Sequence, residues 1–243
     1  MKNSKVLLIV SIIFLSLNQI SISQPKSILS FYGGFSAPLP QLSGQLGSSQ
    51  VVAYQENYGM QTGLNVGLEF KYAFGKKGNF RGVMGYMGNF FINWTEVFTL
   101  GLVDVDRPTI EIGTWNIGGE YAFSPKEKLN PFVGAGLTIN FIGGQSIESA
   151  TRYGFQLGFG ADIAVSNYVG FQGGIKYNLA NLIGKDSDTS KFTTRREIPL
   201  NDGEYYYRGQ HIGAKNISFL QMYLGIEFYL GGSGRGGKTK VIK

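Results

Sequence analysis

One stretch near the C-terminus matches a nucleotide-binding motif to the letter. Residues 232–239 read Gly-Ser-Gly-Arg-Gly-Gly-Lys-Thr, which fits the phosphate-loop pattern G-x-x-x-x-G-K-[ST]. That loop binds phosphate through its backbone amides and through the N-terminus of the helix that follows the lysine. Only residues 240–243 follow here, which are too few for that helix. We therefore interpret 231–243 as a flexible basic tail and expect no cofactor.

A lone histidine is the next candidate for chemistry. His211 could act with a serine and an acidic residue, as in a hydrolase, and Ser218 with Glu197 or Glu204 could supply these groups. The spacing fits no such enzyme, because a lipid A deacylase type would need a serine two residues after the histidine, where this chain has Gly213. With one histidine and no cysteine, a transition-metal site is equally unsupported. We expect a non-enzymatic protein.

The remaining candidates for a functional role are polar side chains, which recur at every second position along many segments of the chain. From residue 28 onward, bulky apolar residues alternate with small or polar ones, which is the period of a β-strand whose two faces meet different surroundings. In segment 109–123 the apolar residues change parity after Ile112, which suggests a bulge near Gly113. Eight such segments are expected, at residues 28–37, 60–74, 80–95, 109–123, 131–141, 152–165, 169–179 and 216–230.

The connections between these segments alternate in length. Those at 75–79, 124–130 and 166–168 are short, whereas the connections after the first, third, fifth and seventh segments are longer. Short periplasmic turns with long extracellular loops are typical of outer-membrane barrels. The sequence therefore predicts an all-β fold, an eight-stranded antiparallel up-and-down transmembrane β-barrel over residues 24–230, with both termini in the periplasm. Loop 180–215, the longest, is the expected binding surface; alternatively, it only shields the barrel rim or partly extends the strands as a hairpin above the membrane.

Aromatic residues gather near both ends of the segments, as expected for rings that lie at headgroup depth. Those near the short turns are Phe74, Phe80, Tyr121, Phe123, Phe132, Tyr168 and Phe171. Those nearer the long loops are Trp94, Trp115, Phe141, Tyr153 and Tyr177. Two such belts predict a lipid-facing band between them.

Volume indicates which face of each strand is inside. The interior of an eight-stranded barrel is just wide enough to be filled by side chains, and the large apolar residues of every strand would overfill it. We therefore expect the apolar parity to face lipid and the small and polar parity to face the lumen. The expected lumen network comprises Asn65, Glu69, Lys71, Arg81, Glu120, Gln156, Asp162, Gln172, Lys176, Gln221 and Glu227.

The charges in this network must pair, because unpaired charges in a narrow, dry lumen are costly. We interpret the network as a structural plug of salt bridges. A gated pore or a proton path is the alternative, although eight strands leave no continuous aqueous channel.

Residues 1–23 have the layout of a secretory signal peptide, with a basic start, an apolar core at 6–17 and a polar end. The core is shorter than a membrane-spanning helix requires. Small residues at Ser21 and Ser23 predict cleavage between Ser23 and Gln24.

Composition excludes several other classes of protein. The chain has no cysteine, which removes disulfides, thiolate metal sites and the anchor of a bacterial lipoprotein. No apolar run after residue 23 is long enough for a spanning helix. The formal net charge of +6 comes from Lys2, Lys5 and the four basic residues of the tail, so the body of the chain is neutral. A nucleic-acid partner is therefore not expected.

The chain resembles the small outer-membrane β-barrels of the OmpA-like and PorT-like type found in Bacteroidetes-type bacteria. The resemblance rests on the signal peptide, on the repeats 63–67 (Gly-Leu-Asn-Val-Gly) and 158–162 (Gly-Phe-Gly-Ala-Asp), and on the closing segment 224–230. It implies a final strand that the barrel-assembly machinery recognises, for which Phe228 and Tyr229 match. The tail after Leu230 departs from that pattern, and no peptidoglycan-binding domain follows.

This resemblance implies a monomer in outer-membrane lipid, with a structural or surface-interaction role and an extracellular ligand that the sequence does not identify. The alternatives are a narrow solute pore and a lipid-modifying or proteolytic barrel enzyme.

Overall fold

The computed structural model describes residues 26–43, 57–75, 77–92, 97–100, 103–106, 109–144, 147–189 and 200–230. The predicted signal peptide, its Ser23–Gln24 cleavage junction and the tail 231–243 lie outside these residues. Among the described helices, none is long and apolar enough to cross a membrane.

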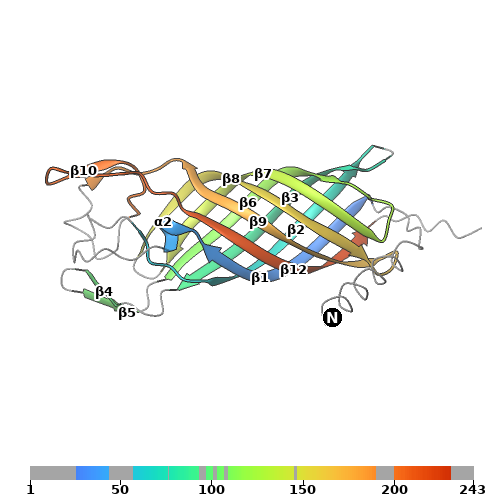
Figure 1. The fold of residues 1–243 in the computed structure, drawn as a ribbon, viewed down its shortest axis with the longest axis horizontal. Helices are drawn as coiled ribbons and strands as arrows, with labels where there is room; N and C mark the ends of the chain where they lie inside the picture. The colour runs from blue at the N-terminus through green and yellow to red at the C-terminus, as the bar shows by residue number, and fades with distance from the viewer. Residues whose placement is uncertain are drawn as a thin grey trace, which may run out of the picture.

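Eight long strands form one closed antiparallel barrel (Figure 1). Strands that follow one another in the barrel pair with each other, and the first strand, β1, closes the barrel by pairing with the last strand, β12. In this pairing Ser27 lies opposite Leu230, and Pro38 lies opposite Phe219. The predicted fold is thus confirmed. The strands are β1 (Ser27–Pro38), β2 (Gly63–Phe74), β3 (Phe80–Ile92), β6 (Thr109–Ala122), β7 (Leu129–Gly144), β8 (Ile147–Ala164), β9 (Val169–Ile183) and β12 (Ser218–Leu230).

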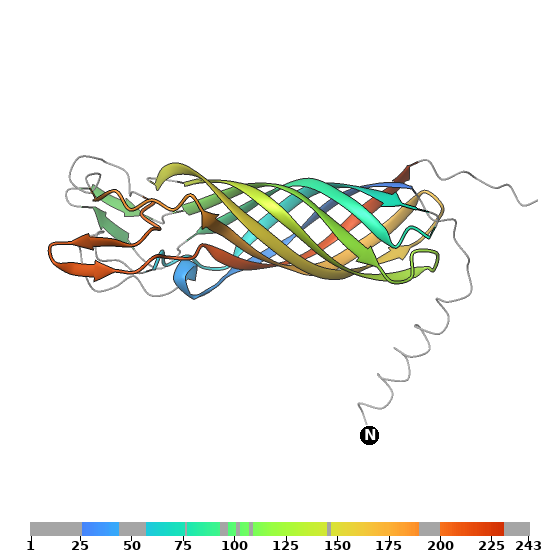
Figure 2. The ribbon, with the colours of Figure 1, turned by 90° about the horizontal axis from the view of Figure 1, so that it is seen from above.

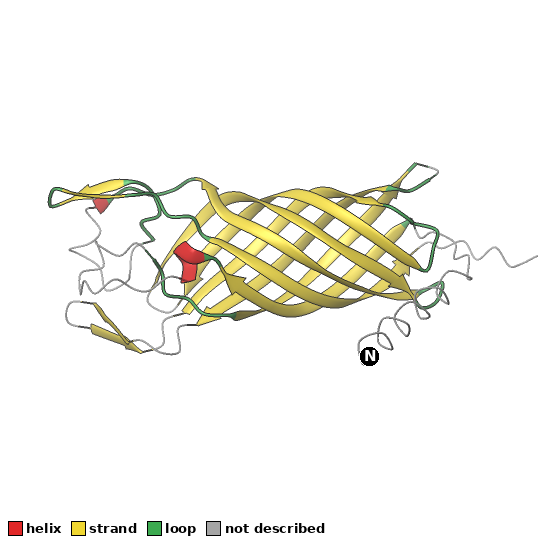
Figure 3. Cartoon of the chain, viewed as in Figure 1, coloured by secondary structure: helices red, strands yellow, loops and turns green. Residues whose placement is uncertain are grey.

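The two ends of the barrel differ, as Figures 2 and 3 show. One end carries short turns, together with the start of β1 and the end of β12. The other end carries longer connections, which contain a four-residue helix and two small hairpins. These elements are α2 (Pro40–Ser43), β4 (Val97–Leu100) with β5 (Val103–Asp106), and β10 (Tyr205–Tyr207) with β11 (Gln210–Ile212).

Two details of the predicted strands are wrong. β7 and β8 extend until only residues 145–146 separate them, so the expected long connection there is mostly strand. No bulge occurs near Gly113, because β6 pairs without interruption with β3 and with β7 on either side of this residue. The register shifts lie elsewhere, between Ile142 and Gly144 and between Tyr153 and Phe155.

The outer face of the barrel is a band of exposed apolar side chains. Leu224 is 77% exposed and Leu137 is 71% exposed, both in the middle of their strands. A soluble monomer rarely exposes an apolar surface that continues around the molecule, whereas lipid requires one. The closed barrel satisfies its backbone hydrogen bonds internally, so it can span a bilayer.

The aromatic residues at the two ends follow the predicted belts with one correction. Phe74, Phe80, Tyr121, Phe123, Tyr168 and Phe171 are exposed at the short-turn end, and Trp115, Phe141 and Tyr153 are exposed toward the other end. Tyr177 is partly exposed, and Trp94 lies outside the described residues. Phe132 does not belong to a belt, because its ring is buried in the lumen.

Inward-facing glycines make room for large side chains in the narrow lumen. A Cβ on Gly67 would lie 2.3 Å from the ring of Tyr32, and one on Gly170 would lie 2.0 Å from the hydroxyl of Tyr229. Glycine on the inward face therefore leaves the space that a long side chain on a neighbouring strand occupies.

Candidate functional site

The structure places all of the predicted lumen residues inside the barrel, where each is at most 8% exposed. They do not form one uniform network. The interior is built in layers from the short-turn end toward the long loops, and each layer has its own chemistry. We call these the charged layer, the amide layer and the apolar seal.

The charged layer is nearest the short turns and consists of Glu69, Lys71, Arg81, Glu120, Asp162, Lys176 and Glu227. Lys71 lies at its centre, with its Nζ 3.2 Å from Glu227, 3.4 Å from Asp162 and 3.6 Å from Glu120. It also donates to Oε1 of Gln172 at 2.9 Å. Strands on opposite sides of the barrel are therefore joined through one ammonium group.

Arg81 joins two of the same carboxylates. Its guanidinium lies 2.5 Å from Glu120 and 2.6 Å from Asp162, and Asp162 also accepts from Asn130 at 3.0 Å. The ring of Phe132 lies under both cations, 4.7 Å from Nζ of Lys71 and 5.6 Å from Cζ of Arg81. Phe132 therefore contributes a cation–π contact inside the barrel instead of contacting lipid.

Lys176 forms a second centre on the side of the layer that faces the long loops. It makes an ion pair with Glu69, and its Nζ lies 4.7 Å from the ring centre of Tyr32 and 4.9 Å from that of Tyr223. Both aromatic rings are buried. A carboxylate and two ring faces thus surround the ammonium group.

The amide layer follows and consists of Ser36, Asn65, Asn89, Thr114, Thr138, Asn140, Asn178 and Gln221. Oδ1 of Asn89 accepts from Ser36 at 2.8 Å and from Gln221 at 2.6 Å. On the opposite wall, Thr114 donates to Asn140 at 2.8 Å. These uncharged groups hydrogen-bond across the lumen and fill its middle.

The apolar seal closes the lumen toward the long loops and consists of Leu42, Tyr58, Met60, Phe91, Ile110, Ile112, Ile142, Ala180, Leu200, Ile217 and Phe219. Strand residues supply its wall, and the rings of Phe91 and Phe219 meet edge to face with centres 5.3 Å apart. Leu42 of α2, Met60 and Leu200 come from the connections and fill its top. The loops are thus part of the core.

Above the seal, Asp202 fixes the loop between β9 and β12. Its carboxylate accepts from Nε of Arg152 at 2.9 Å, from Nη2 of Arg152 at 2.8 Å and from Asn181 at 2.8 Å. The backbone amide of Asp186 donates to it at 2.9 Å. Asp202 is completely buried, so it ties loop residues to the walls formed by β8 and β9.

Burial also shifts two loop groups of this region. Burial raises the pKa of Tyr205, at the base of the β10–β11 hairpin, to about 12. Burial lowers the pKa of Lys185 from its usual value, although the Asp202 carboxylate acts in the opposite direction. Lys185 donates to Asn216 at 2.7 Å and so links the two ends of the loop.

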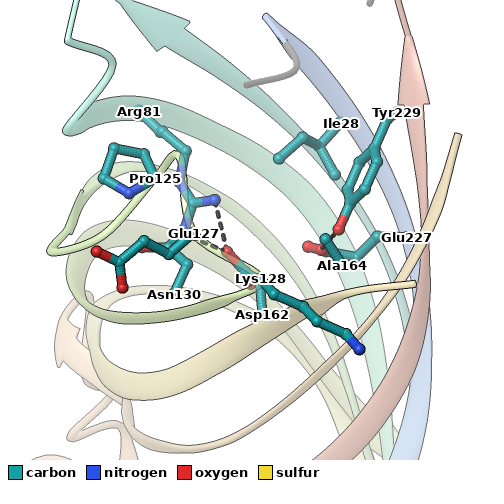
Figure 4. A pocket seen from close by; sticks show the side chains of 10 residues that line it. All are labelled: Ile28, Arg81, Pro125, Glu127, Lys128, Asn130, Asp162, Ala164, Glu227 and Tyr229. Atoms are coloured by element: carbon teal, nitrogen blue, oxygen red, sulfur yellow. Dashed lines mark hydrogen bonds and ion pairs between the residues drawn. The ribbon is translucent and has the colours of Figure 1, made fainter. Parts of the chain in front are cut away.

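The interior holds small cavities. One of about 30 Å³ lies at the short-turn mouth, where Arg81 points to Asp162 and the hydroxyl of Tyr229 points to Glu227 (Figure 4). A second, also of about 30 Å³, lies deeper in the lumen. Because a buried water needs at least about 10–15 Å³, each cavity has room for only a few waters.

The structure places His211 against Glu204, one of the two acidic residues that could act with it. It lies in β11 with its ring nitrogen 2.7 Å from Glu204 and its ring centre 4.9 Å from that of Tyr206. Ser218 begins β12 in the barrel wall and is buried there, and Glu197 lies outside the described residues. Among the described residues, no cluster of three or more His, Cys, Asp or Glu is placed to hold a metal.

Sequence reasoning missed several buried residues of the lumen. Asn89 shares the inward parity of Arg81, and Asn116 shares that of Glu120, so parity alone could have identified them. The alternation does not predict the apolar seal, because it places apolar residues on the lipid face along the whole length of each strand. The signal was the parity change in β6, where Ile110 and Ile112 face inward although they are apolar.

No protein-family model matches the chain, and no curated protein matches it. Solved structures do match. Neisserial surface protein A aligns with a TM-score of 0.51 at 14% identity, over 84% of this chain and 97% of its own. The outer membrane protein OprG from Pseudomonas aeruginosa aligns with a TM-score of 0.48 at 11% identity, over 87% of this chain and 100% of its own. The first of these likenesses shows that the chain has the fold of a small outer-membrane β-barrel.

Proposed function

We propose that this protein is a non-enzymatic barrel of a bacterial outer membrane that acts through its extracellular loops, with both termini in the periplasm. It would lie in outer-membrane lipid as a monomer, after insertion by the barrel-assembly machinery. Within this class we place it with the OmpA-like and PorT-like barrels, on the sequence features given above. The observation that carries the proposal is a filled lumen beneath a loop hairpin, β10–β11, whose base is buried.

The lumen argues against transport. Lys71 and Arg81 join strands across the charged layer, and Phe91 and Phe219 meet within the apolar seal. A solute would have to displace buried ion pairs and a packed apolar layer in turn, and both steps are costly. The geometry therefore favours a closed barrel over a narrow pore.

The loop end argues for a surface role. Asp202 fixes the loop that carries the β10–β11 hairpin, and Tyr205 and Ile212 are buried at the base of that hairpin. Tyr206 is nevertheless 69% exposed toward its tip. A hairpin whose base is buried and which presents an aromatic side chain is suited to binding, because less conformational entropy is lost on association.

Conductance measurements test the closed barrel. Purified, refolded protein in planar bilayers is expected to give no discrete current steps, while a porin recorded in the same bilayers gives them. Reproducible steps from this protein would favour the pore instead.

Single cysteines test the orientation, because the chain has no cysteine of its own. Tyr206→Cys at the hairpin and Lys126→Cys in the turn between β6 and β7 are both at exposed positions at opposite ends of the barrel. On intact cells, a membrane-impermeant maleimide is expected to label the cysteine at 206 and not the one at 126. Labelling of 126 alone would reverse the proposed orientation.

A further inference from the structure

The charged layer does not balance. Its carboxylates are Glu69, Glu120, Asp162 and Glu227, whereas its cations are Lys71, Arg81 and Lys176. One formal negative charge is therefore left over in a part of the barrel that is almost closed to solvent. An uncompensated buried charge is strongly unfavourable, so either a proton or a further cation balances it.

The deeper cavity of about 30 Å³ lies beside this layer. Glu69, Asn116, Glu120 and Gln156 line it. Asn116 is 3% exposed and Gln156 is 7% exposed; the side-chain carbonyl oxygen of each has no hydrogen-bond partner in the protein, and neither has Nδ2 of Asn116. Two buried amide oxygens without partners thus face the same small space as two carboxylates.

Glycines keep this space open. Gly134 and Gly158 form part of the cavity wall. A Cβ on Gly134 would lie 3.1 Å from Cβ of Glu120, and one on Gly85 would lie 2.8 Å from Oδ1 of Asn116. Side chains at these positions would crowd the groups that line the cavity.

We propose that this cavity binds one monovalent alkali cation, held by the carboxylate of Glu120 and the amide oxygens of Asn116 and Gln156. Hard cations prefer oxygen ligands of this kind, and a single positive charge balances the layer. Lys176 also lines the cavity, but Glu69 and the rings of Tyr32 and Tyr223 already surround its ammonium group. The site is independent of the loops and so of the proposed surface role.

Two other occupants make different predictions. Water alone would give the amide oxygens partners but would leave the extra charge in place. A proton shared among the carboxylates would remove the charge but would leave the amide oxygens without a ligand. Water and a shared proton together would account for both observations, but they would give no dependence on the alkali cation, so the two explanations make opposite predictions.

The test uses the full mature chain refolded in a zwitterionic detergent, with a tetramethylammonium salt replaced stepwise by the Na⁺ or K⁺ salt at constant ionic strength. The readout is the temperature at which the folded barrel loses its compact electrophoretic mobility. This midpoint is expected to rise with the concentration of Na⁺ or K⁺ and then to saturate, because a ligand that binds only the folded state stabilises it by mass action. Tetramethylammonium, which is too large for the cavity, is expected to have no such effect.

Variants locate the site. Gln156→Leu and Asn116→Leu each remove one oxygen ligand and are expected to abolish the dependence on the alkali cation. Thr138→Val is the matched control, because Thr138 is a buried lumen residue of the amide layer that does not line the cavity. It is expected to keep the dependence whatever it does to stability.

Should the leucine variants fail to refold, crystals of the unaltered protein grown with Tl⁺ provide a direct readout. An anomalous peak within the cavity is expected. Equal midpoints in all three salts, a dependence that survives in both leucine variants, or the absence of a Tl⁺ peak from the cavity would each overturn the proposal.

Discussion

Lys71 makes more ion pairs than any other residue of the charged layer. It is 1% exposed and lies within 3.6 Å of carboxylates from three other strands. Removing one partner of a buried ion pair leaves uncompensated charge, which costs far more than a surface pair contributes. The charged layer therefore depends on this one side chain.

Lys71→Met keeps most of the volume of the side chain and removes its charge. We expect it to lower the free energy of unfolding by about 3–5 kcal/mol, because the carboxylates are left facing one another. Urea unfolding in lipid vesicles measures this loss. The control, Lys126→Met in an exposed turn, is expected to change stability little. Equal effects of the two changes would contradict the central role of Lys71.

At this scale the sequence predicts where side chains point better than what they do. Period-two alternation places Glu69 and Lys71 inside, because successive side chains of a strand face opposite sides. It does not show that Lys176 lies between two aromatic rings, since Tyr32 and Tyr223 are about 190 residues apart in sequence and meet only when the barrel closes. Phe132 is a different case, because its aromatic type suggests a belt whereas its parity places it in the lumen.

Among the elements, the loop between β9 and β12 depends on one buried carboxylate. Asp202→Ala removes the acceptor for Arg152 and Asn181, and hydrogen bonds to charged groups contribute about 1.5–3 kcal/mol each. We expect limited trypsin digestion within the loop to become about tenfold faster or more, while the barrel keeps its compact mobility. Glu127→Ala, at the opposite end, is the control. Unchanged digestion would show that the loop is held by other contacts.

The base of the β10–β11 hairpin gives this loop a dependence on pH. Burial raises the pKa of Tyr205 to about 12 from its ordinary value of 10.0, because the phenolate is disfavoured in the folded hairpin. The contribution of Tyr205 to stability is therefore complete below about pH 10 and is lost as the pH rises through about 12. The difference in phenolate absorbance between the unaltered protein and Tyr205→Phe gives this titration. A midpoint near 10 would contradict the burial.

The strands themselves followed from the sequence, but their ends did not. The parity change in β6 was read as a bulge because an apolar residue was assumed to face lipid, whereas the lumen becomes apolar where Ile110 and Ile112 enter the seal. The run at 143–146, Gly-Gly-Gln-Ser, has turn composition and suggested a longer loop than the structure has. Local sequence thus carries a signal in both places, but it does not distinguish an apolar stretch of lumen from a bulge, or an extended strand end from a turn.

At the scale of the whole molecule, the exposed apolar band is the surface that we expect to contact lipid. Leu224→Arg places a charge in the middle of β12 on the outer face. We expect a loss of about 2–4 kcal/mol in unfolding from vesicles, as for a cation near the bilayer midplane. Tyr206→Arg, on the loop hairpin, is expected to have little effect. A neutral outcome for Leu224→Arg would mean that water covers this face.

The pairing of β1 with β12 has a consequence for biosynthesis. It joins Ser27 to Leu230, so the last contact that closes the sheet is between residues about 200 positions apart, and contacts of such high sequence separation form slowly. Until the final strand has been synthesised, the chain has two unpaired strand edges and an exposed apolar surface. A growing chain in that condition is prone to aggregate in water. The nascent polypeptide must therefore be kept from contact with other copies of itself until it is complete and can insert into a bilayer.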